Sequence, residues 1–282
     1  MTGQASCYTI ISSDVPLLRR CVENARERAG IEHEWIVVGW SPTDGILAEC
    51  DRLGVRCVPM KLPESPGPEA HPEQRTAWFI RCLYQAWNAG YEHSTSKWVA
   101  RLGSDQYFSK NWLANLLACA ERHGDRSIYD MTTVESPVAK RSRHEIRDWG
   151  TTPGEFDEVG RQRFDSWAND LAYRMRSNPT VRGDMCDLWY NHPTRGRQRR
   201  SDGCSWLQTR DLWSEFGPMP DAVMHGVSPD VAYRDAIQDA GVSSYLCLTA
   251  STYHLVAGES RDIQGHSKVV AWHGAQKLRN PF

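Results

Sequence analysis

The first sixty residues alternate short apolar runs with segments of helical periodicity, and this alternation restricts the fold more than any other feature. Short runs rich in β-branched and aromatic residues predict strands at Tyr8–Ile11, Trp35–Val38 and Val55–Met60. Between them, apolar residues recur at helical spacing, with a short second helix expected from Ile46 to Leu53. Strands and helices in this order predict a parallel sheet with right-handed crossovers.

The same alternation continues to about residue 125. A helix from Arg75 to Gly90 precedes a fourth strand at Trp98–Leu102, and Ser109 is expected to cap the helix that follows. We therefore treat residues 1–125 as one half of the chain, in which a ligand is expected at the carboxyl ends of the strands.

After this point the regular alternation of predicted strands and helices ends. We expect a strand at Ile128–Val134, a helix beginning at Ser228-Pro229-Asp230, and a last strand at Tyr245–Thr249 that leads to His254. Residues 126–257 form the second half, with an inserted basic segment. The polar C-terminal tail, residues 258–282, is expected to be mobile until substrate binds.

Cysteine usage and hydropathy bear on the compartment. The nine cysteines are odd in number and show no C-x-x-C spacing, which argues against a disulfide framework and against a structural zinc site. The apolar runs are too short to span a bilayer, and the first residues lack the basic region of a signal peptide. With a formal net charge of −2, no global field attracts nucleic acid or anionic membrane. We expect a cytoplasmic protein that does not insert into a membrane.

One carboxylate stands out because of its position. Asp105 follows the fourth strand in the segment Arg101-Leu102-Gly103-Ser104-Asp105. At the carboxyl end of a strand in an α/β chain, a carboxylate is well placed to hold a divalent metal and a diphosphate. The alternative is an ordinary turn residue.

The order of several motifs resembles that of a GT-A fold glycosyltransferase of the family-2 type. The motifs are Ser12-Ser13-Asp14, Ser41-Pro42-Thr43-Asp44-Gly45, Ala86-Trp87-Asn88-Ala89-Gly90, Ser104-Asp105, the aromatic segment from Trp206 to Gly217, and Asp230 at the start of a helix. The resemblance covers residues 5–125 well and residues 202–256 loosely. It implies an α/β, Rossmann-like, mostly parallel sheet flanked by helices, with a smaller acceptor-side region. Residues 1–125 would then be the nucleotide-sugar-binding half, and residues 126–257 the acceptor-binding and catalytic half. The chain departs from the family where the usual D-x-D motif is reduced to Ser104-Asp105-Gln106.

The resemblance also implies roles for individual residues. Asp105 and His254 would bind a divalent metal, Mn²⁺ or Mg²⁺, and an imidazole ligand favours Mn²⁺. Asp230 would be the general base, with Asp202 and Asp221 as alternatives. The nucleotide-sugar site would consist of Ser12, Ser13, Asp14, Asp44, Arg75, Arg101, Ser104 and Asp105. Turn chemistry, helix capping and solvated arginines are the alternative explanations for these residues.

The implied reaction is sugar transfer from a nucleoside diphosphate sugar, UDP-sugar favoured, to a hydroxyl acceptor, with metal assistance and inversion of configuration. The acceptor is expected to be a glycan or another small hydroxylated molecule. Nucleic acid, including hydroxylated bases of DNA, is a second option, because basic residues and aromatic rings lie close together in the sequence. The basic residues are Arg141, Arg143, Arg197, Arg199 and Arg200, and the rings are Trp149, Trp167, Trp189 and Tyr190. For the basic loops, the alternatives are that they are simply solvated or that they close over the diphosphate. For the chain as a whole, the remaining alternatives are a non-catalytic sugar- or nucleic-acid-binding relative and a nucleotidyltransferase.

Overall fold

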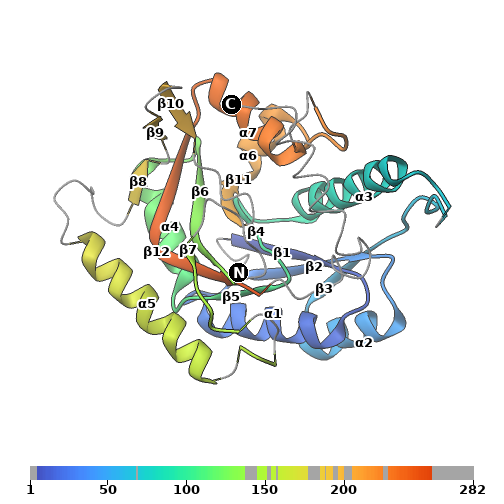
Figure 1. Cartoon of the computed structure of the whole chain (residues 1–282), viewed down its shortest axis with the longest axis horizontal. Helices are drawn as coiled ribbons and strands as arrows, with labels where there is room; N and C mark the ends of the chain where they lie inside the picture. Colours follow the sequence, from blue (N-terminus) through green and yellow to red (C-terminus); the bar gives the residue numbers. More distant parts are fainter. Residues whose placement is uncertain are drawn as a thin grey trace.

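The structure is a computed structural model of an α/β fold, in which a mixed sheet is flanked by helices (Figure 1). It describes residues 5–67, 69–136, 145–150, 154–156, 158–176, 185–187, 189–192, 196–199, 205–224 and 228–255. No helix in these ranges is long and apolar enough to cross a membrane.

The N-terminal half contains the strands and helices that the sequence predicts, most of them slightly longer, and a further short strand at Gln106–Phe108 that it does not predict. They are β1 (Ala5–Ile11), α1 (Val15–Arg28), β2 (Glu34–Trp40), α2 (Asp44–Leu53), β3 (Arg56–Met60), α3 (Pro72–His93), β4 (Trp98–Arg101), β5 (Gln106–Phe108) and α4 (Trp112–His123). The caps explain several boundaries. Asp14 accepts a hydrogen bond from the backbone of Leu17 at the start of α1, and Gly54 ends α2 in a left-handed conformation.

The second half adds strands to the same sheet and three further helices among the described residues. Its elements are β6 (Ser127–Glu135), β7 (Glu145–Ile146), α5 (Glu158–Arg176), β8 (Met185–Asp187), β9 (Trp189–His192), β10 (Gly196–Arg199), β11 (Trp206–Thr209), α6 (Arg210–Phe216), α7 (Pro229–Asp239) and β12 (Ser243–His254). The strands β9 and β10 form a separate antiparallel pair.

The main sheet has the order β3-β2-β1-β4-β11-β6-β12-β5. The strands β1 to β4 are parallel, and β12 is parallel to β6, whereas β11 runs antiparallel to both of its neighbours. The α/β class and the mostly parallel sheet flanked by helices are thus confirmed. Because β1, β2 and β4 are parallel, the loops that follow them meet at one edge of the sheet.

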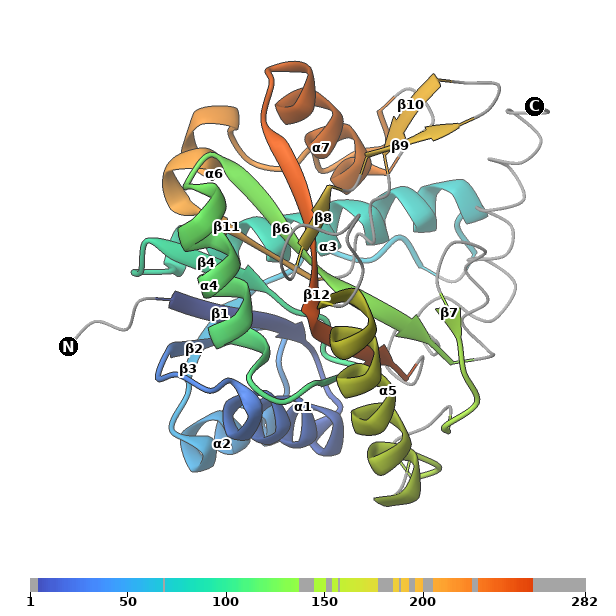
Figure 2. The same cartoon turned by 90° about the vertical axis from the view of Figure 1, so that its left-hand side faces the viewer.

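Three hydrophobic clusters fill the space around the sheet. The helices α1, α2 and α4 pack on one face, and α3, α6 and α7 pack on the other. The helix α5 lies beside β12 (Figure 2). Its Phe164, Trp167 and Leu171 pack in the third cluster with Tyr107 of β5 and Tyr253 of β12. Trp167, which was considered as a ring platform, is buried in this third cluster.

Two expectations about elements were wrong. Ser109 does not cap a helix: α4 begins at Trp112, and Ser109 instead exchanges hydrogen bonds with Ser251 at 2.9 Å in each direction. The last strand is also longer than expected, because a bulge between Cys247 and Ser251 lets β12 continue to His254. His254 is therefore the last residue of a strand and not a residue beyond it.

Candidate active site

The loop after β4 is held in place from beneath by two buried polar side chains. The backbone N–H of Gly103 donates to Oε1 of Gln106 at 3.1 Å and to Oγ of Ser205 at 3.2 Å. The Ser205 hydroxyl in turn donates to the same oxygen of Gln106. These contacts fix the turn that presents Ser104 and Asp105, both of which are half-buried.

Asp105 and His254, the two residues expected to bind metal, lie in direct contact. Nε2 of His254 is 2.9 Å from Oδ2 of Asp105, although the residues are 149 positions apart. The pairing of β5 with β12 places His254 opposite Gln106, and the backbone N–H of Leu255 donates to the carbonyl of Asp105 at 2.9 Å. The Asp105 side chain keeps 19% exposure and the His254 side chain 11%, so Asp105 is half-buried and His254 is nearly buried.

This pair suits a divalent cation in its chemistry. A carboxylate oxygen and an imidazole nitrogen converge there, and both are ordinary ligands of Mn²⁺. Among the described residues, no group of three or more His, Cys, Asp or Glu side chains forms a complete metal site. This chain would therefore supply two ligands, and a metal would need further oxygen ligands from substrate or water.

Asp230 lies at the start of α7, near Arg101, the last residue of β4. Its Oδ1 accepts a hydrogen bond of 2.6 Å from the hydroxyl of Tyr84 in α3. Burial acts to raise the pKa of Asp230, but the charge of Arg101, together with the hydrogen bonds from Tyr84 and Ser228, holds this pKa below its ordinary value. Asp230 is therefore an ionised carboxylate at neutral pH, which a proton acceptor must be.

Arg101 belongs to a buried column of alternating cations and rings. Its guanidinium carbon lies 4.2 Å from the ring centre of Trp87 and 4.1 Å from that of Trp206. Arg234 lies 4.6 Å from the same ring of Trp206 and is paired with the buried Asp130. Arg101 was expected to contact phosphate, and that role stays a prediction. In the structure its charge acts on Asp230 from the interior.

The residues expected to contact the nucleotide lie on neighbouring loops. The backbone N–H of Thr43 donates to the carbonyl of Ser12 at 3.3 Å, which joins the loop after β1 to the loop after β2. Ser13 and Asp44 are exposed on these loops, whereas Ser12 and Asp14 are half-buried. Asp14 also caps α1, so its capping role is established and its nucleotide contact stays a prediction.

Two arginines have buried N–H groups that find no hydrogen-bond partner in the described part of the chain. They are Nε of Arg75, which the sequence singled out, and Nη1 of Arg20, which it did not. Burial and the charge of Arg161 lower the pKa of Arg20, while Asp14 raises it. Arg20 and Arg161 thus repel each other near the loop after β1, and Nε of Arg161 also lacks a partner. Such an arrangement favours a bound anion.

Sequence reasoning missed Tyr84 as well. It identified α3 by Phe79, Cys82, Leu83 and Ala86, of which Phe79 and Leu83 are only partly buried. A second set with helical spacing, Ile80, Tyr84, Trp87 and Tyr91, is buried against the sheet. That spacing was visible in the sequence and could have placed Tyr84 and Trp87 beside β4.

Some expectations fall on residues of which little is described. Arg141, Arg143, Arg200 and Asp202 lie outside the described residues, and the side chains of Arg197, Arg199, Trp189 and Tyr190 are not described. Asp221, the other alternative base, accepts a hydrogen bond from Gln85 at 3.1 Å and lies 3.8 Å from Arg81. The described part of the chain gives nucleic-acid binding no support.

Comparisons with known proteins fit this arrangement. Residues 81–179 match the model of glycosyl transferase family 2. Two solved structures resemble the fold at 14% sequence identity each. One is GalNAc-T7 with UDP, GalNAc and Mn²⁺, with a TM-score of 0.53 over 92% of this chain and 45% of that one. The other is the mannosyltransferase PcManGT from Pyrobaculum calidifontis with GDP-Man and Mn²⁺, with a TM-score of 0.54 over 99% of this chain and 65% of that one.

The resemblance to GT-A fold, family-2-like glycosyltransferases is confirmed by these matches, as is the GT-A fold. At 14% identity the two structures establish the fold alone. This chain spans less than two thirds of either solved chain. No curated protein sequence matches the chain.

Proposed function

We propose that this chain, with its GT-A fold and family-2 segment, transfers a sugar from a nucleoside diphosphate sugar to a hydroxyl acceptor with inversion of configuration. The observation that carries the proposal is the contact between Asp105 and His254 at 2.9 Å, formed where β4 ends. A UDP-sugar is the first choice of donor and a GDP-sugar the second. The acceptor is a glycan or another small hydroxylated molecule.

The donor would lie along the loops after β1, β2 and β4. Ser12, Ser13, Asp14 and Asp44 would contact the base and ribose, because their backbones meet at the carboxyl ends of adjacent parallel strands. The unpartnered N–H groups of Arg75 and Arg20 would donate to the diphosphate. Ser104 and Asp105 would lie beneath it.

Oδ2 of Asp105 and Nε2 of His254 would hold the divalent cation. When bound, Mn²⁺ or Mg²⁺ supplies Lewis-acid stabilisation of the departing diphosphate. The two residues thus hold the position at which negative charge develops during transfer.

Asp230 would act as the general base. It accepts the proton of the acceptor hydroxyl while the acceptor oxygen bonds to the anomeric carbon and the bond from that carbon to the diphosphate oxygen breaks. A single displacement of this kind inverts the configuration. Tyr84 orients the carboxylate through its 2.6 Å hydrogen bond, and Arg101 keeps it ionised.

The experiment is a thermal-shift screen of UDP, GDP and their sugars, with and without Mn²⁺, followed by transfer assays with the stabilising donor. Binding to the native state raises the melting temperature by mass action. Asp105→Asn and His254→Gln should each remove the metal-dependent shift. Asp230→Asn should keep the shift and lose transfer by about a hundredfold or more, as general bases contribute. Asp51→Asn, at an exposed position of α2, is the matched control.

Each outcome bears on the proposal. A metal-dependent shift that Asp105→Asn abolishes supports it, and hydrolysis or transfer of the same donor establishes catalysis. Binding without any turnover would instead favour a non-catalytic relative. If no nucleotide stabilises the protein, or if Asp230→Asn transfers sugar at the original rate, the assignment of these residues is wrong.

The free thiols support a reducing, cytoplasmic location. No disulfide joins the cysteines whose side chains are described, in keeping with a compartment that keeps thiols reduced. They are Cys7, Cys21, Cys50, Cys57, Cys82, Cys119 and Cys247.

A further inference from the structure

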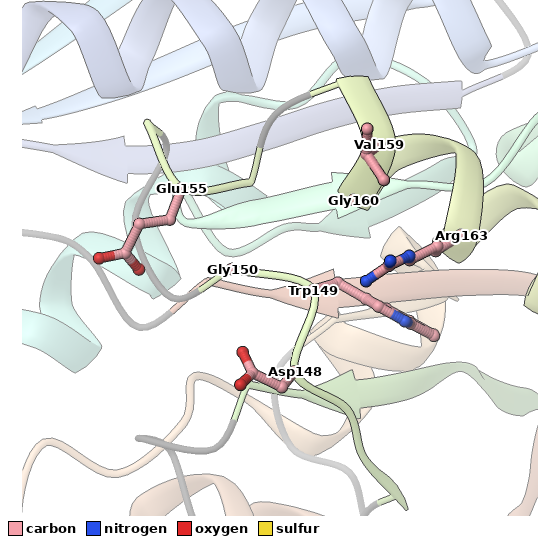
Figure 3. A pocket seen from close by; sticks show the side chains of 7 residues that line it. All are labelled: Asp148, Trp149, Gly150, Glu155, Val159, Gly160 and Arg163. Carbon is pink, nitrogen blue, oxygen red and sulfur yellow. The ribbon is translucent and has the colours of Figure 1, made fainter.

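An open pocket and a buried ion pair, neither of which the proposed reaction uses, hold charged side chains in contrasting surroundings. The pocket, of about 440 Å³, lies between the loop that follows β7 and the first turns of α5, and its Asp148 and Arg163 are exposed (Figure 3). The ion pair joins Arg234 in α7 to Asp130 in β6, and both side chains are 0% exposed. Charges in an open pocket keep their hydration, whereas the buried pair has lost it and needs a reason to exist.

Stability alone does not explain the pair of Arg234 and Asp130. Taking two charges out of water often costs as much as their attraction returns, and well-packed apolar residues of similar volume are commonly at least as stabilising. Nη2 of Arg234 donates to Oδ1 of Asp130, and the guanidinium lies 4.6 Å from the ring centre of Trp206. The effect of the pair is therefore to fix the place of a buried positive charge.

Arg234 stands one helical turn after Asp230 in α7. The two residues are four positions apart, which is the spacing at which an acid and an arginine on one helix face meet as an ion pair. The acid also precedes the arginine, which is the favoured order for such a pair. Local helix geometry alone would thus bring the guanidinium of Arg234 to the carboxylate of Asp230.

In the structure, Arg234 pairs instead with Asp130 of the neighbouring strand β6. Its charge still lowers the pKa of Asp230, but it contributes less than the charge of Arg101 does. Asp230 is half-buried, whereas Asp130 is fully enclosed. The carboxylate that holds Arg234 is therefore the one that no acceptor can reach.

We propose that Asp130 is a positioning residue for sugar transfer, because it holds Arg234 in the interior and so keeps this guanidinium from occupying the carboxylate of Asp230. A carboxylate in a direct ion pair with a guanidinium is a weaker base, and it has fewer lone pairs left for the acceptor hydroxyl. This role rests on the general-base assignment of Asp230 in the proposed function, but the movement of Arg234 can be observed without any transfer.

The other titratable and charged groups that act on Asp230 come from different elements. Tyr84 of α3 donates to its carboxylate at 2.6 Å, and the charge of Arg101, at the end of β4, acts on it from the interior. A change of Asp130 to asparagine alters neither group and removes only the charge that retains Arg234. Its effect on Asp230 can therefore be assigned to that arginine.

Kinetics of the full chain give the first test. Asp130→Asn, which keeps the shape of the side chain, should lower kcat by about tenfold to a hundredfold, the worth of one hydrogen bond to a charged group, and leave the KM for the donor unchanged. The double variant Asp130→Asn/Arg234→Met should recover most of this loss, because no cation is left to occupy Asp230. All rates are compared at equal folded fraction.

The acidic limb of the kcat/KM profile separates an effect of charge from an effect of shape. A guanidinium that moves to Asp230 favours its charged form, so the limb should shift to lower pH in Asp130→Asn. Loss of the cation disfavours the charged form, so the limb should shift to higher pH in Arg234→Met. Asp165→Asn is the matched control, because it removes the charged partner of Arg28 between α1 and α5 and should leave kcat and the limb unchanged.

A crystal structure of the Asp130→Asn variant gives a readout that needs no turnover. It should show the guanidinium of Arg234 within about 4 Å of the carboxylate of Asp230, the usual limit of an ion pair. A guanidinium left in its original place would overturn the proposal. If Asp130→Asn does not fold, Arg234→Met decides: an acidic limb that stays in place or moves to lower pH would overturn the proposal as well.

The positioning role and the proposed function fail differently. Sugar transfer in which Asp130→Asn changes neither kcat nor the acidic limb would overturn the positioning role and leave the function standing. A movement of Arg234 to Asp230 in a protein that turns over no donor would confirm that Asp130 retains the arginine, and would overturn the transferase proposal.

Discussion

The pKa of Asp230 is subject to two opposing effects. Burial disfavours its charged form, while Arg101 and Tyr84 favour it strongly enough to lower its pKa. A low pKa ensures ionisation but weakens a base, because proton-transfer efficiency follows basicity. Since the folded pKa is depressed, Asp230 stabilises the fold above its unfolded pKa, and this contribution is lost as the pH falls through the folded value.

The first prediction concerns Tyr84→Phe, which removes the hydroxyl that donates to Asp230 at 2.6 Å. The pKa of Asp230 should rise, so the acidic limb of the kcat/KM profile should move to higher pH. The rate should fall by about tenfold, the value of one hydrogen bond to a charged group. Transfer measured across the pH range tests this.

Tyr129→Phe is the matched control, because its hydroxyl also makes a 2.6 Å hydrogen bond, here to the carbonyl of Gly124 away from the site. If the acidic limb stays in place in Tyr84→Phe, then Tyr84 does not tune the base. An equal loss of rate in both variants would point to a general effect on stability.

Among the elements, the contact between α3 and β1 depends on a glycine. A Cβ on Gly90 would lie 2.0 Å from the ring of Tyr8, which is fully buried and donates its hydroxyl to the carbonyl of Trp87 at 2.8 Å. Gly90→Ala should lower the free energy of unfolding by about 1–2 kcal/mol, because overpacking outweighs the better helix propensity of alanine.

Urea unfolding of Gly90→Ala measures this difference. Gly67→Ala is the control, since a Cβ there meets nothing within 4 Å, and it should change the free energy by about 0.5 kcal/mol or less. A Gly90→Ala protein as stable as the original would mean that α3 can move away from β1 at no cost.

The helices α1 and α2 are joined by Glu49. Its carboxylate accepts hydrogen bonds from Arg19 at 2.7 Å and from Arg52 at 2.6 Å, and these hold the pKa of Glu49 at about 2. The depressed pKa stabilises the fold above the ordinary value of about 4.3, and this stabilisation is lost as the pH falls towards about 2.

We therefore expect Glu49→Gln to be less stable than the original protein at about pH 7 and to approach it at about pH 3. Urea unfolding at both pH values measures the two differences. Glu23→Gln, which removes the exposed partner of Arg52 at 3.0 Å, should have little effect at either pH. If Glu49→Gln lowers the free energy of unfolding by the same amount at both pH values, the charge of Glu49 is not what links the helices.

The elements also show what the sequence could predict. The βαβ rhythm, the caps at Asp14 and Gly54 and the helix start at Pro229 are local patterns, and the structure contains all of them. The strand β5 and the full length of β12 were missed because their pairing is non-local and β12 is interrupted by a bulge. The same pairing brings His254 to Asp105, which only the family resemblance had suggested.

The site residues also fall into two groups, those that local sequence reveals and those that depend on non-local packing. Asp105 and Asp230 stand next to strand and helix ends, which a single sequence shows. The positions of Tyr84 and Arg20 in the site depend on how α3 and α1 pack, and their interactions with Asp230 and Arg161 span long stretches of chain. Periodicity could have placed Tyr84 on a buried face, but it could not have named Asp230 as its partner.

On the scale of the whole molecule, one sheet runs through both halves of the chain. The strand β11 pairs with β4 from the first half and β6 from the second, and β12 pairs with β5. One hydrophobic cluster contains Trp98 and Phe108 together with Met131 and Leu207. The division at residue 125 is thus proposed as a functional one, between donor and acceptor sides, and we do not expect it to divide the fold into independent units.

The last prediction follows from this shared sheet. The chain should unfold in a single transition whose calorimetric enthalpy equals its van't Hoff enthalpy, although chains of more than about 150 residues often populate intermediates. A fragment of residues 1–125 should not fold alone, because β4 would lose β11 and β5 would lose β12. Scanning calorimetry of the full chain and circular dichroism of the fragment test both statements. Two separate transitions, or a folded fragment with cooperative melting, would show that the first half is stable without the strands that complete its sheet.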